Sequence, residues 1–273
     1  MTIAVVGNFT EGVIFAVDSA VSAVNEATGA VLHVFENGQK IYHIGKDRDC
    51  LDSPYGAMLF GSASFSRTSW RNVFADFCNR YNPAAQESAQ DVVVEFVEYL
   101  RNLEPSEEKR PNGGVFLAGY GPSDSTVRCF KIDEHNLSSE ETPIRVLSFD
   151  GIADIVQKHV FGMALRTRNA LEKAFGDVMV DVLEKGGEQK QIPVAKMVVD
   201  ILQENGPLCL PEMTMPLRDA IDYMHFLVYS TIKHFKFAPG APICGGAVEI
   251  AAITRDRGFR RIRTKPLDSA ITI

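Results

Sequence analysis

The chain has 273 residues, 45% of them hydrophobic and 23% charged, which is enough for one large soluble domain or two modest ones. Its 28 basic and 35 acidic side chains give a net charge of −7, and this acidic balance argues against nucleic-acid binding, which depends on neutralising phosphates. No apolar run approaches the about 20 residues of a membrane helix, and the five cysteines are scattered without a C-x-x-C pair, which argues against a disulfide or zinc framework.

The first part of the chain is predicted to form strands. The apolar runs at 2–7 and 13–17 are continuous rather than alternating, which is typical of strands covered on both faces. Residues 31–35 and the strand at 38–45 flank an Asn-Gly pair, which predicts a hairpin with a tight turn. A fourth strand ends on Gly61.

Two helices are predicted next, at 70–81 and 89–103. In each, apolar side chains recur three and four residues apart and form one stripe that would be buried. Ser88 and Asp91 have the spacing of a capping box at the start of the second helix. A hairpin formed by residues 113–121 and 126–133 follows a charged loop.

The second half of the chain continues the mixture of strands and helices. Residues 176–216 are rich in glycine and proline around a short helix at 194–203, and we interpret them as an insertion that serves as an oligomer contact or a lid. The other predicted elements are a strand at 144–149, a helix of about two dozen residues after Asp150-Gly151, a helix at 217–235, and closing strands at 247–254 and 259–262.

Polar residues outside the first strands give little sign of a site. His159 and His225 lie on predicted buried helix stripes, where a hydrogen-bonded core histidine is commoner than a base. Asp47, Asp49 and Asp52 lack the glycine and the closing glutamate of a calcium loop, so we expect a solvated loop there. No histidine pair has the spacing of a metalloprotease helix. We expect no metal and no organic cofactor.

Four residues near the N-terminus suggest a reaction centre: Thr2, Asp18, Lys40 and Gly61. A threonine hydroxyl is a poor nucleophile until a base takes its proton, and a free α-amine, which titrates near pH ~8, can be that base. Thr2 acquires such an amine if Met1 is removed. A nearby Lys40 would favour the deprotonated forms, Asp18 would hold the lysine, and backbone N–H groups at Gly61 would stabilise an oxyanion.

These residues resemble the proteasome β-type family of N-terminal nucleophile (Ntn) hydrolases. The matching motifs are Thr2, the Phe-Ala-Val-Asp-Ser run at 15–19, Gln-Lys-Ile at 39–41 and Leu-Phe-Gly-Ser-Ala at 59–63. The resemblance continues through Leu-Ala-Gly-Tyr-Gly at 117–121 and a glycine-glycine strand at 244–253, and it covers roughly two thirds of the chain.

The resemblance implies a role for each of the four residues. Thr2 would be the nucleophile and Asp18 a structural acid. Lys40 would lower the proton affinity of the threonine, and the Gly61 N–H would be the oxyanion donor. Leu59 would shape the main specificity pocket, which suggests a modest apolar preference.

The sequence also departs from the family. In the family, a serine, an aspartate and a second serine usually support the nucleophile. The corresponding positions in this sequence fall near Asp150-Gly151, at Ala241 and near Cys244. Ala20 stands where a basic residue is usual, and Asp18 and Lys40 are about six residues further apart in the sequence than is typical. These changes suggest either another group that orients the amine or a weakened or inactive relative.

The resemblance implies an α+β fold, specifically a four-layer αββα sandwich of two antiparallel sheets, in a single domain over 1–273 with the insertion at 176–216. It implies a threonine-type endopeptidase that cleaves peptides or unfolded proteins within a homo-oligomeric ring, with an ATP-dependent unfoldase as a further partner. Because no charged-then-apolar signal segment precedes Thr2, we expect a cytoplasmic protein with neither membrane nor nucleic acid as a partner.

Two alternatives stay open at this point. In the first, the chain is a catalytically inactive, proteasome-like structural subunit that is retained for ring assembly. In the second, Thr2 is the nucleophile of an Ntn amidase that cleaves a small amide.

Overall fold

The computed structural model describes residues 2–24, 28, 31–45, 54–151, 156–157, 160, 165–175, 178–183, 189–205, 212–239 and 244–264. The contacts of the chain divide it into two units. The larger consists of Met1–Ile152 and Met213–Ile273, and the smaller of Ala153–Glu212.

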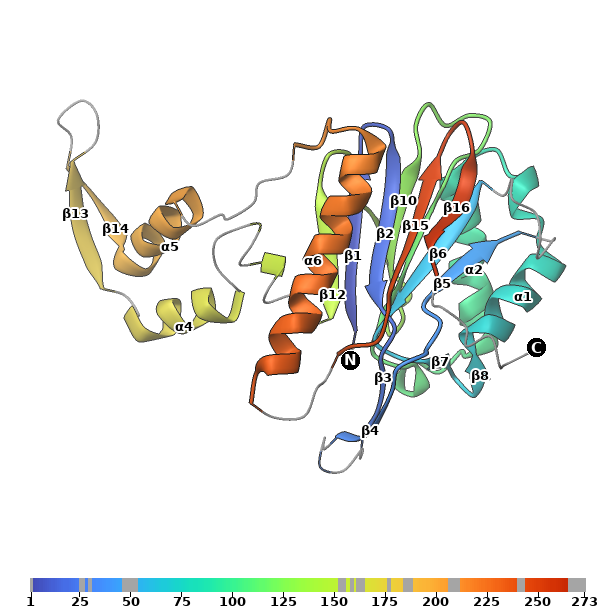
Figure 1. The fold of residues 1–273 in the computed structure, drawn as a ribbon, viewed down its shortest axis with the longest axis horizontal. Coiled ribbons are helices and arrows are strands. Elements are labelled where there is room, and N and C mark those ends of the chain that lie inside the picture. The colour runs from blue at the N-terminus through green and yellow to red at the C-terminus, as the bar shows by residue number, and fades with distance from the viewer. Residues whose placement is uncertain are drawn as a thin grey trace. The chain divides into compact units, whose positions relative to one another are not determined.

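The larger unit contains two five-stranded antiparallel sheets between layers of helices (Figure 1). Helix α6 (Leu217–Phe237) packs on one of these sheets, called sheet I below. Helices α1 (Trp70–Arg80) and α2 (Ala89–Leu103) pack on the other, called sheet II. The predicted αββα sandwich is confirmed. Sheet I has the order β12 (Leu147–Gly151), β1 (Ile3–Phe9), β2 (Gly12–Asp18), β15 (Val248–Thr254), β16 (Gly258–Arg263), and sheet II has the order β11 (Ser139–Glu141), β10 (Arg128–Asp133), β9 (Gly114–Gly119), β6 (Tyr55–Phe60), β5 (Ile41–Ile44).

Both faces of the central strands are covered, as the continuous apolar runs predict. Every residue of β1, β2 and β6 is buried. In β6, Met58 and Phe60 belong to the core between the sheets, whereas Ala57 and Leu59 belong to the core beneath the helices. This alternation follows from the two-residue repeat of a strand, and it holds β6 firmly between two apolar layers.

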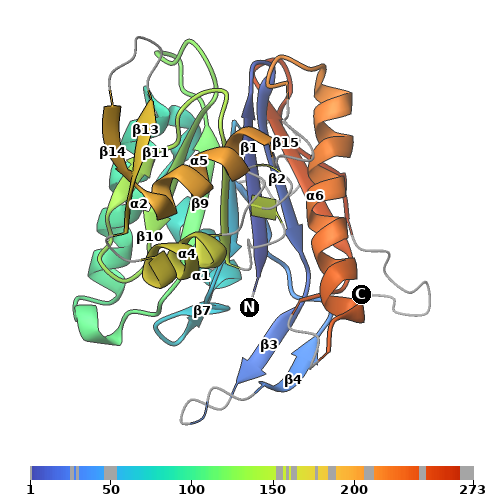
Figure 2. The same cartoon turned by 90° about the vertical axis from the view of Figure 1, so that its left-hand side faces the viewer.

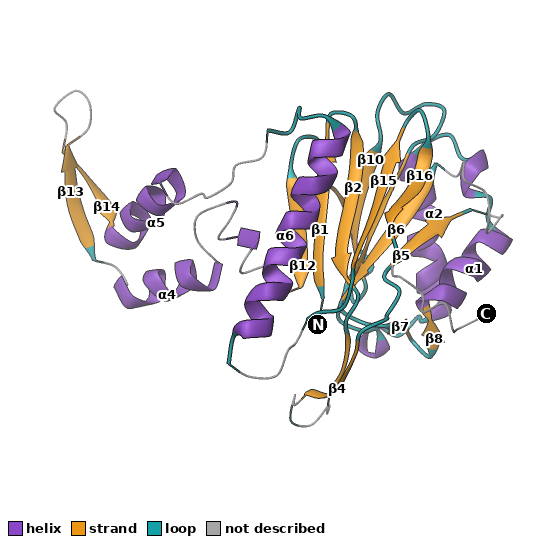
Figure 3. Cartoon of the chain, viewed as in Figure 1, coloured by secondary structure: helices purple, strands orange, loops and turns teal. Residues whose placement is uncertain are grey.

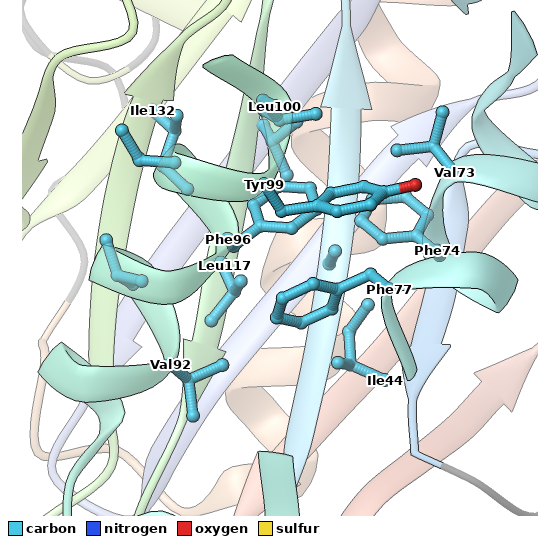
Figure 4. Packing of buried hydrophobic residues seen from close by; sticks show 14 of the residues in the cluster. Ile44, Val73, Phe74, Phe77, Val92, Phe96, Tyr99, Leu100, Leu117 and Ile132 are labelled. Carbon is cyan, nitrogen blue, oxygen red and sulfur yellow. The ribbon is translucent and has the colours of Figure 1, made fainter. Parts of the chain in front are cut away.

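The core between sheet II and its helices is rich in aromatic side chains (Figure 4). The ring of Phe77 lies edge-on to that of Phe96, with centroids 5.0 Å apart, a geometry that aromatic pairs favour. The apolar stripes predicted for the two helices supply these side chains. The capping box at the start of α2 is also confirmed, because Ser88 and Asp91 bond to each other's backbone N–H groups.

The first strand of sheet I carries the start of the chain to one end of the sandwich. Strand β1 lies between β12 and β2, with Ile3 opposite Gly151 and Ala4 opposite Val17. Thr2, which precedes β1, therefore lies beside the end of β2, where Asp18 is the last residue.

The predicted hairpin of residues 31–35 with 39–45 is wrong. Strand β4 (Val31–Phe35) pairs instead with β3 (Val21–Val24), and β5 pairs with β6 in sheet II. Glu36 and Asn37 lie in a turn, but the Gly38 N–H donates to the Ser19 carbonyl and the strand that follows does not pair with β4. Lys40 consequently lies just before β5 rather than within a strand.

Several small elements complete the described part of the larger unit. A small hairpin joins β7 (Ser64–Phe65) to β8 (Thr68–Ser69), and two single-turn 3-10 helices occupy Pro83–Ala85 and Glu107–Lys109 (Figure 3). The hairpin of β9 and β10 is confirmed, as is that of β15 and β16.

The smaller unit contains α4 (Leu165–Phe175), α5 (Val194–Asn205) and a hairpin of β13 (Met179–Leu183) with β14 (Gln189–Pro193) (Figure 2). The helix at α5 matches the predicted short helix, but the hairpin has no counterpart in the sequence-based expectation. A single domain with an insertion at 176–216 stays a prediction.

None of the helices in the described part of the chain combines the length and the apolar character that crossing a membrane requires.

Candidate active site

A buried ion pair lies at the end of β2. The Asp18 carboxylate, fully buried, accepts a hydrogen bond from the Lys40 ammonium at 2.8 Å. The same oxygen, Oδ1, accepts the backbone N–H of Ile3 at 2.9 Å, while Oδ2 accepts those of Gly245 at 3.2 Å and Ala20 at 3.3 Å. One carboxylate therefore joins the first strand, the residues after β2, the turn before β15 and the lysine.

The surroundings of Lys40 have two opposite effects on the pKa of its ammonium group. Burial lowers the pKa of the Lys40 ammonium, and the charge of Asp18 partly offsets that effect. The Lys40 carbonyl accepts the N–H of Leu59 at 2.9 Å, and the Lys40 N–H donates to the carboxylate of buried Glu249 at 3.3 Å. The lysine is thus fixed by its backbone as well as by its side chain.

Thr2, Lys40 and Gly61 line one cavity of about 600 Å³. Asp18 lies behind it, bonded both to Lys40 and to the residue that follows Thr2. The structure therefore brings the four residues predicted as a site together at one end of the sandwich. The rest of the lining is mainly small or apolar and includes Ala20, Val21, Gly38, Tyr42, Leu59, Phe60, Ala63 and Asn112.

The turn after β6 requires glycine at position 61. Gly61 has a φ of +85°, which side chains rarely adopt, and a Cβ there would lie 2.5 Å from the Cα of Gly113. The two glycines allow the turn to pack against the start of β9, so the backbone of the turn lies at the cavity wall.

A second cavity, of about 480 Å³, shares Thr2, Phe60, Gly61 and Asn112 with the first. Its charged lining residues include Lys131 and Asp150, which form an ion pair. Gly151 also lines it and has a φ of +77°, and a Cβ at this position would lie 1.9 Å from the Thr2 carbonyl oxygen. Thr2 therefore contributes to the walls of both cavities.

The positions where the sequence departs from the expected support set have distinct surroundings. Asp150 is engaged by Lys131, and its Oδ1 accepts the Gly151 N–H at 2.7 Å. Cys244 is a buried free thiol, and burial, with a further contribution from the Asp18 charge, raises the pKa of Cys244 to about 12. Ala20 is buried at the first cavity, and Ala241 lies outside the described residues.

Two charged residues of this region were missed from the sequence, Glu249 and Lys131. Glu249 stands between Val248 and Ile250 as the one charged residue of a buried strand, whereas Lys131 lies in a strand that also carries Arg128 and Asp133. A lone charge in a buried strand is the signal that could have found Glu249, because burying a charge without a partner is costly.

The other polar residues considered from the sequence do not join this site. His225 lies on α6, half-buried, with its Nε2 at 2.7 Å from the Arg263 guanidinium. His159 and the aspartates at 47, 49 and 52 lie outside the described residues. Within the part of the chain that the structure describes, no three His, Cys, Asp or Glu side chains are grouped as a metal site would need.

Glu134 is a buried acid behind the Gly61 turn. Its side chain is fully buried, and neither carboxyl oxygen has a hydrogen-bond partner among the described residues. A Cβ on Gly113 would lie 3.0 Å from Oε1 of Glu134, so the carboxyl group packs directly against the start of β9. Burial, reinforced by the charge of Asp133, raises the pKa of Glu134 to about 9. The carboxyl group is therefore protonated at neutral pH.

Comparison with known proteins identifies the fold. No known family profile and no curated protein sequence matches the chain. Several solved structures do match the chain. Anbu, an ancestral beta-subunit, from Yersinia bercovieri matches with a TM-score of 0.58 and 13% identity, and the match covers 95% of this chain and 87% of that one. The helical assembly of the Anbu complex from Pseudomonas aeruginosa matches with a TM-score of 0.58 and 13% identity, and the match covers 98% of this chain and 88% of that one. Anbu from Hyphomicrobium sp. strain MC1 matches with a TM-score of 0.56 and 13% identity, and the match covers 95% of this chain and 87% of that one.

The fold is therefore the Ntn-hydrolase fold in its proteasome-like form. The resemblance to the proteasome β-type family itself is wrong, because the similar structures are Anbu proteins, which are proteasome-like in fold but distinct. The motifs that suggested the family lie in or next to β1, β2, β5, β6, β9 and β15, which are strands of the two sheets of the shared fold.

The buried ion pair leads to a stability prediction. We expect Asp18→Ala to lower the free energy of unfolding by about 3–5 kcal/mol, because it leaves the Lys40 charge buried without its partner. The matched control is Asp150→Ala, which breaks the more exposed pair with Lys131 and should cost at most about 1 kcal/mol. Denaturant unfolding followed by the fluorescence of Trp70, the single tryptophan, measures both. Equal losses would contradict the assignment of a buried, organising pair.

Glu134 leads to a prediction about pH. Its pKa is raised from 4.5 in the unfolded chain to about 9, so the group destabilises the fold progressively as the pH rises from about 4.5 to about 9. Glu134→Gln removes this effect. We expect the variant and the wild type to be about equally stable at pH 4, and the variant to be more stable by on the order of 5 kcal/mol at pH 8.

Unfolding curves at several pH values test this prediction, with Glu140→Gln on exposed strand β11 as the control for the loss of a surface carboxylate. A stability difference between Glu134→Gln and the wild type that does not change with pH would show that the Glu134 carboxyl is not buried in its protonated form.

Proposed function

We propose that the protein is an N-terminal threonine hydrolase that cleaves peptide bonds. The observation that supports this most strongly is the single cavity lined by Thr2, Lys40 and Gly61, with Asp18 bonded to the lysine and to the Ile3 N–H. This places a hydroxyl, a buried cation and a glycine turn around one space that a substrate carbonyl can enter.

The proposed reaction requires Thr2 to be the first residue of the mature chain. Its α-amine takes the proton from the Thr2 hydroxyl, and the hydroxyl oxygen attacks the substrate carbonyl carbon. The Lys40 cation favours the deprotonated amine because it raises the cost of a further positive charge nearby, and it favours the deprotonated hydroxyl because it attracts the negative charge that forms there. The amine then passes the proton to the leaving nitrogen, and water releases the acyl group from the threonine by the same steps in reverse order.

The Gly61 N–H is the proposed oxyanion donor. Its turn is held against Gly113 at a φ that only glycine adopts readily, so the direction of the N–H is fixed before substrate arrives. Donors that need no rearrangement stabilise the tetrahedral intermediate most effectively.

The lining of the first cavity supports a modest apolar preference. Val21 and Leu59 contribute aliphatic surface and Tyr42 contributes an aromatic ring, while the charged lining residue is Lys40, which is paired. An apolar substrate side chain of ordinary size fits this chemistry.

We further propose that the sites work inside a homo-oligomer. The similar structure from Pseudomonas aeruginosa is a helical assembly of the Anbu complex. An assembly of this chain, ring-shaped or helical, would shelter its sites from folded proteins. Substrates would then arrive as peptides or unfolded chains, supplied by an ATP-dependent unfoldase.

The surroundings of two residues favour a second candidate, a non-catalytic structural subunit. Cys244 and Asp150 lie near the positions where an active support set would carry serine hydroxyls. Cys244 is instead a neutral buried thiol, and Asp150 is a carboxylate paired with Lys131. In this case the ion pair of Asp18 and Lys40 would serve the fold alone.

Substitution of Thr2 tests the proposal. We expect Thr2→Ala to lower kcat/KM on fluorogenic peptides by at least about 1000-fold, since it removes the nucleophile, and Thr2→Ser to keep part of the activity. Thr10→Ala, at an exposed turn, is the control and should be unchanged. Turnover by Thr2→Ala equal to that of the wild type would remove Thr2 from any role.

The same assay separates the candidate functions. A wild type that is inactive on peptides but cleaves small amides in a Thr2-dependent way is an amidase. A wild type that is inactive on both, with Thr2 at its N-terminus, is the structural subunit.

A further inference from the structure

A third cavity, of about 530 Å³, lies between α6, the segment 244–248 and the turn after β4. This volume is within the range of small-molecule sites. Its charged lining residues are Lys233, Lys236, Arg263 and Glu36, so three permanent cations face one carboxylate. The chain as a whole carries seven more acidic than basic side chains, and such a local excess of positive charge is therefore unusual for it.

The cavity wall on α6 is a regular stripe. His225, Tyr229 and Lys233 are spaced four residues apart and Lys236 follows three later, so they share one face of the helix. The rings of His225 and Tyr229 are stacked with centroids 5.5 Å apart, and the Lys233 ammonium lies 4.9 Å from the centre of the Tyr229 ring. These contacts hold the stripe in place and direct a cation toward the cavity.

Arg263 enters the cavity from the end of β16. Its Nη1 lies 2.7 Å from Nε2 of His225. Burial and the charge of Arg263 lower the pKa of His225, so the ring is neutral and accepts this hydrogen bond. The contact engages one of the five N–H donors of the guanidinium and orients the planar group, which binds carboxylates and phosphates with paired hydrogen bonds.

We infer that this cavity binds a small molecule carrying two or more anionic groups, phosphate or carboxylate. Two lysine ammonium groups and an oriented guanidinium provide separate contacts for separate anionic groups, and a single carboxylate, Glu36, does not neutralise them. The ring of Tyr229 and the side chains of Ile232 and Val248 supply apolar surface for the part of the molecule that joins the charges.

The walls of this cavity continue into the residues around Asp18. Gly245, which lines the cavity, donates its N–H to Asp18 and accepts the N–H of Ala20 at 3.1 Å. The carbonyl of Glu36 accepts the Ser19 hydroxyl at 2.6 Å. A ligand that holds these two walls together is expected to stabilise the fold, and this effect does not depend on catalysis.

Calorimetric titration of the full chain with inorganic pyrophosphate and with citrate tests the inference, with inorganic monophosphate and sodium chloride at equal ionic strength as comparisons. We expect one site per chain, a Kd below about 1 mM for at least one of the two polyanions, at least about tenfold weaker binding of monophosphate, and a rise in Tm with the tighter ligand. Binding of pyrophosphate alone would identify a phosphate compound, and binding of citrate alone a carboxylate.

Charge substitutions locate the site. The double variant Lys233→Gln/Lys236→Gln should weaken binding by at least about 10-fold, since each lost charge removes an attraction in a partly desolvated cavity. The matched control is Arg218→Gln/Arg257→Gln, which changes the net charge equally at positions away from the cavity lining and should alter Kd less than about twofold. Asn37→Asp, nearly isosteric, adds a negative charge to the lining and should also weaken binding.

Two results would overturn the inference. One is the absence of binding by both polyanions at about 10 mM and low ionic strength. The other is a loss of affinity in the lysine double variant that is no greater than in the arginine control, with Asn37→Asp binding as the wild type does.

Discussion

The buried charge of Asp18 is the constraint on which the rest of the site depends. A carboxylate at this depth is tolerated only when it is paired and hydrogen-bonded, and here the Lys40 ammonium and three backbone N–H groups fulfil that condition. The donors come from four separate segments of the chain. Satisfying one acid therefore fixes the start of β1, the end of β2, the approach to β5 and the turn before β15 relative to one another.

This arrangement contributes little net stability to the fold. A buried ion pair seldom stabilises a protein more than apolar residues of similar volume would, since both charges lose their hydration. The pair does, however, keep a cation at the wall of the cavity that Thr2 also lines. The proposed chemistry needs such a cation, because the amine and hydroxyl of Thr2 must give up protons near neutral pH.

Glycine completes the geometry where backbone segments meet. Gly61 and Gly113 pack back to back, and Gly151 lies against the Thr2 carbonyl, so these three positions add no side chain to the space around Thr2. Two cavities consequently meet at this residue, one with apolar walls and one with the pair of Lys131 and Asp150. In the proposed reaction these two spaces would take the two sides of the bond that is cleaved.

Local sequence signals predicted most strands and helices, and the resemblance supplied their four-layer arrangement, but neither predicted all of the strand pairings. The continuous apolar strands and the helix stripes follow from burial and periodicity, which each segment carries by itself. Strand β4 pairs with β3, which precedes it, and β5 pairs with β6, and a turn motif does not encode this choice of partners. The hairpin of β13 and β14 was missed because Gly-Gly and proline residues there suggested loops around a helix.

The candidate site was predictable to a similar extent. Thr2, Asp18, Lys40 and Gly61 stand in recognisable short motifs, and the fold brings them together. Lys131 and Glu249 come from distant strands and reach the site only through sheet register, while Glu134 is exceptional through its burial rather than its sequence. The family was misassigned because the matching motifs describe a fold that the proteasome-like Anbu proteins share.

The mass of the intact protein, purified from cells without any N-terminal extension, tests the central claim most directly. The account predicts a chain that has lost Met1 and begins with an unmodified Thr2, whose amine can act as the base. A chain that retains Met1, or that carries an acyl group on Thr2, would have no free amine at that position and would contradict the proposed catalysis.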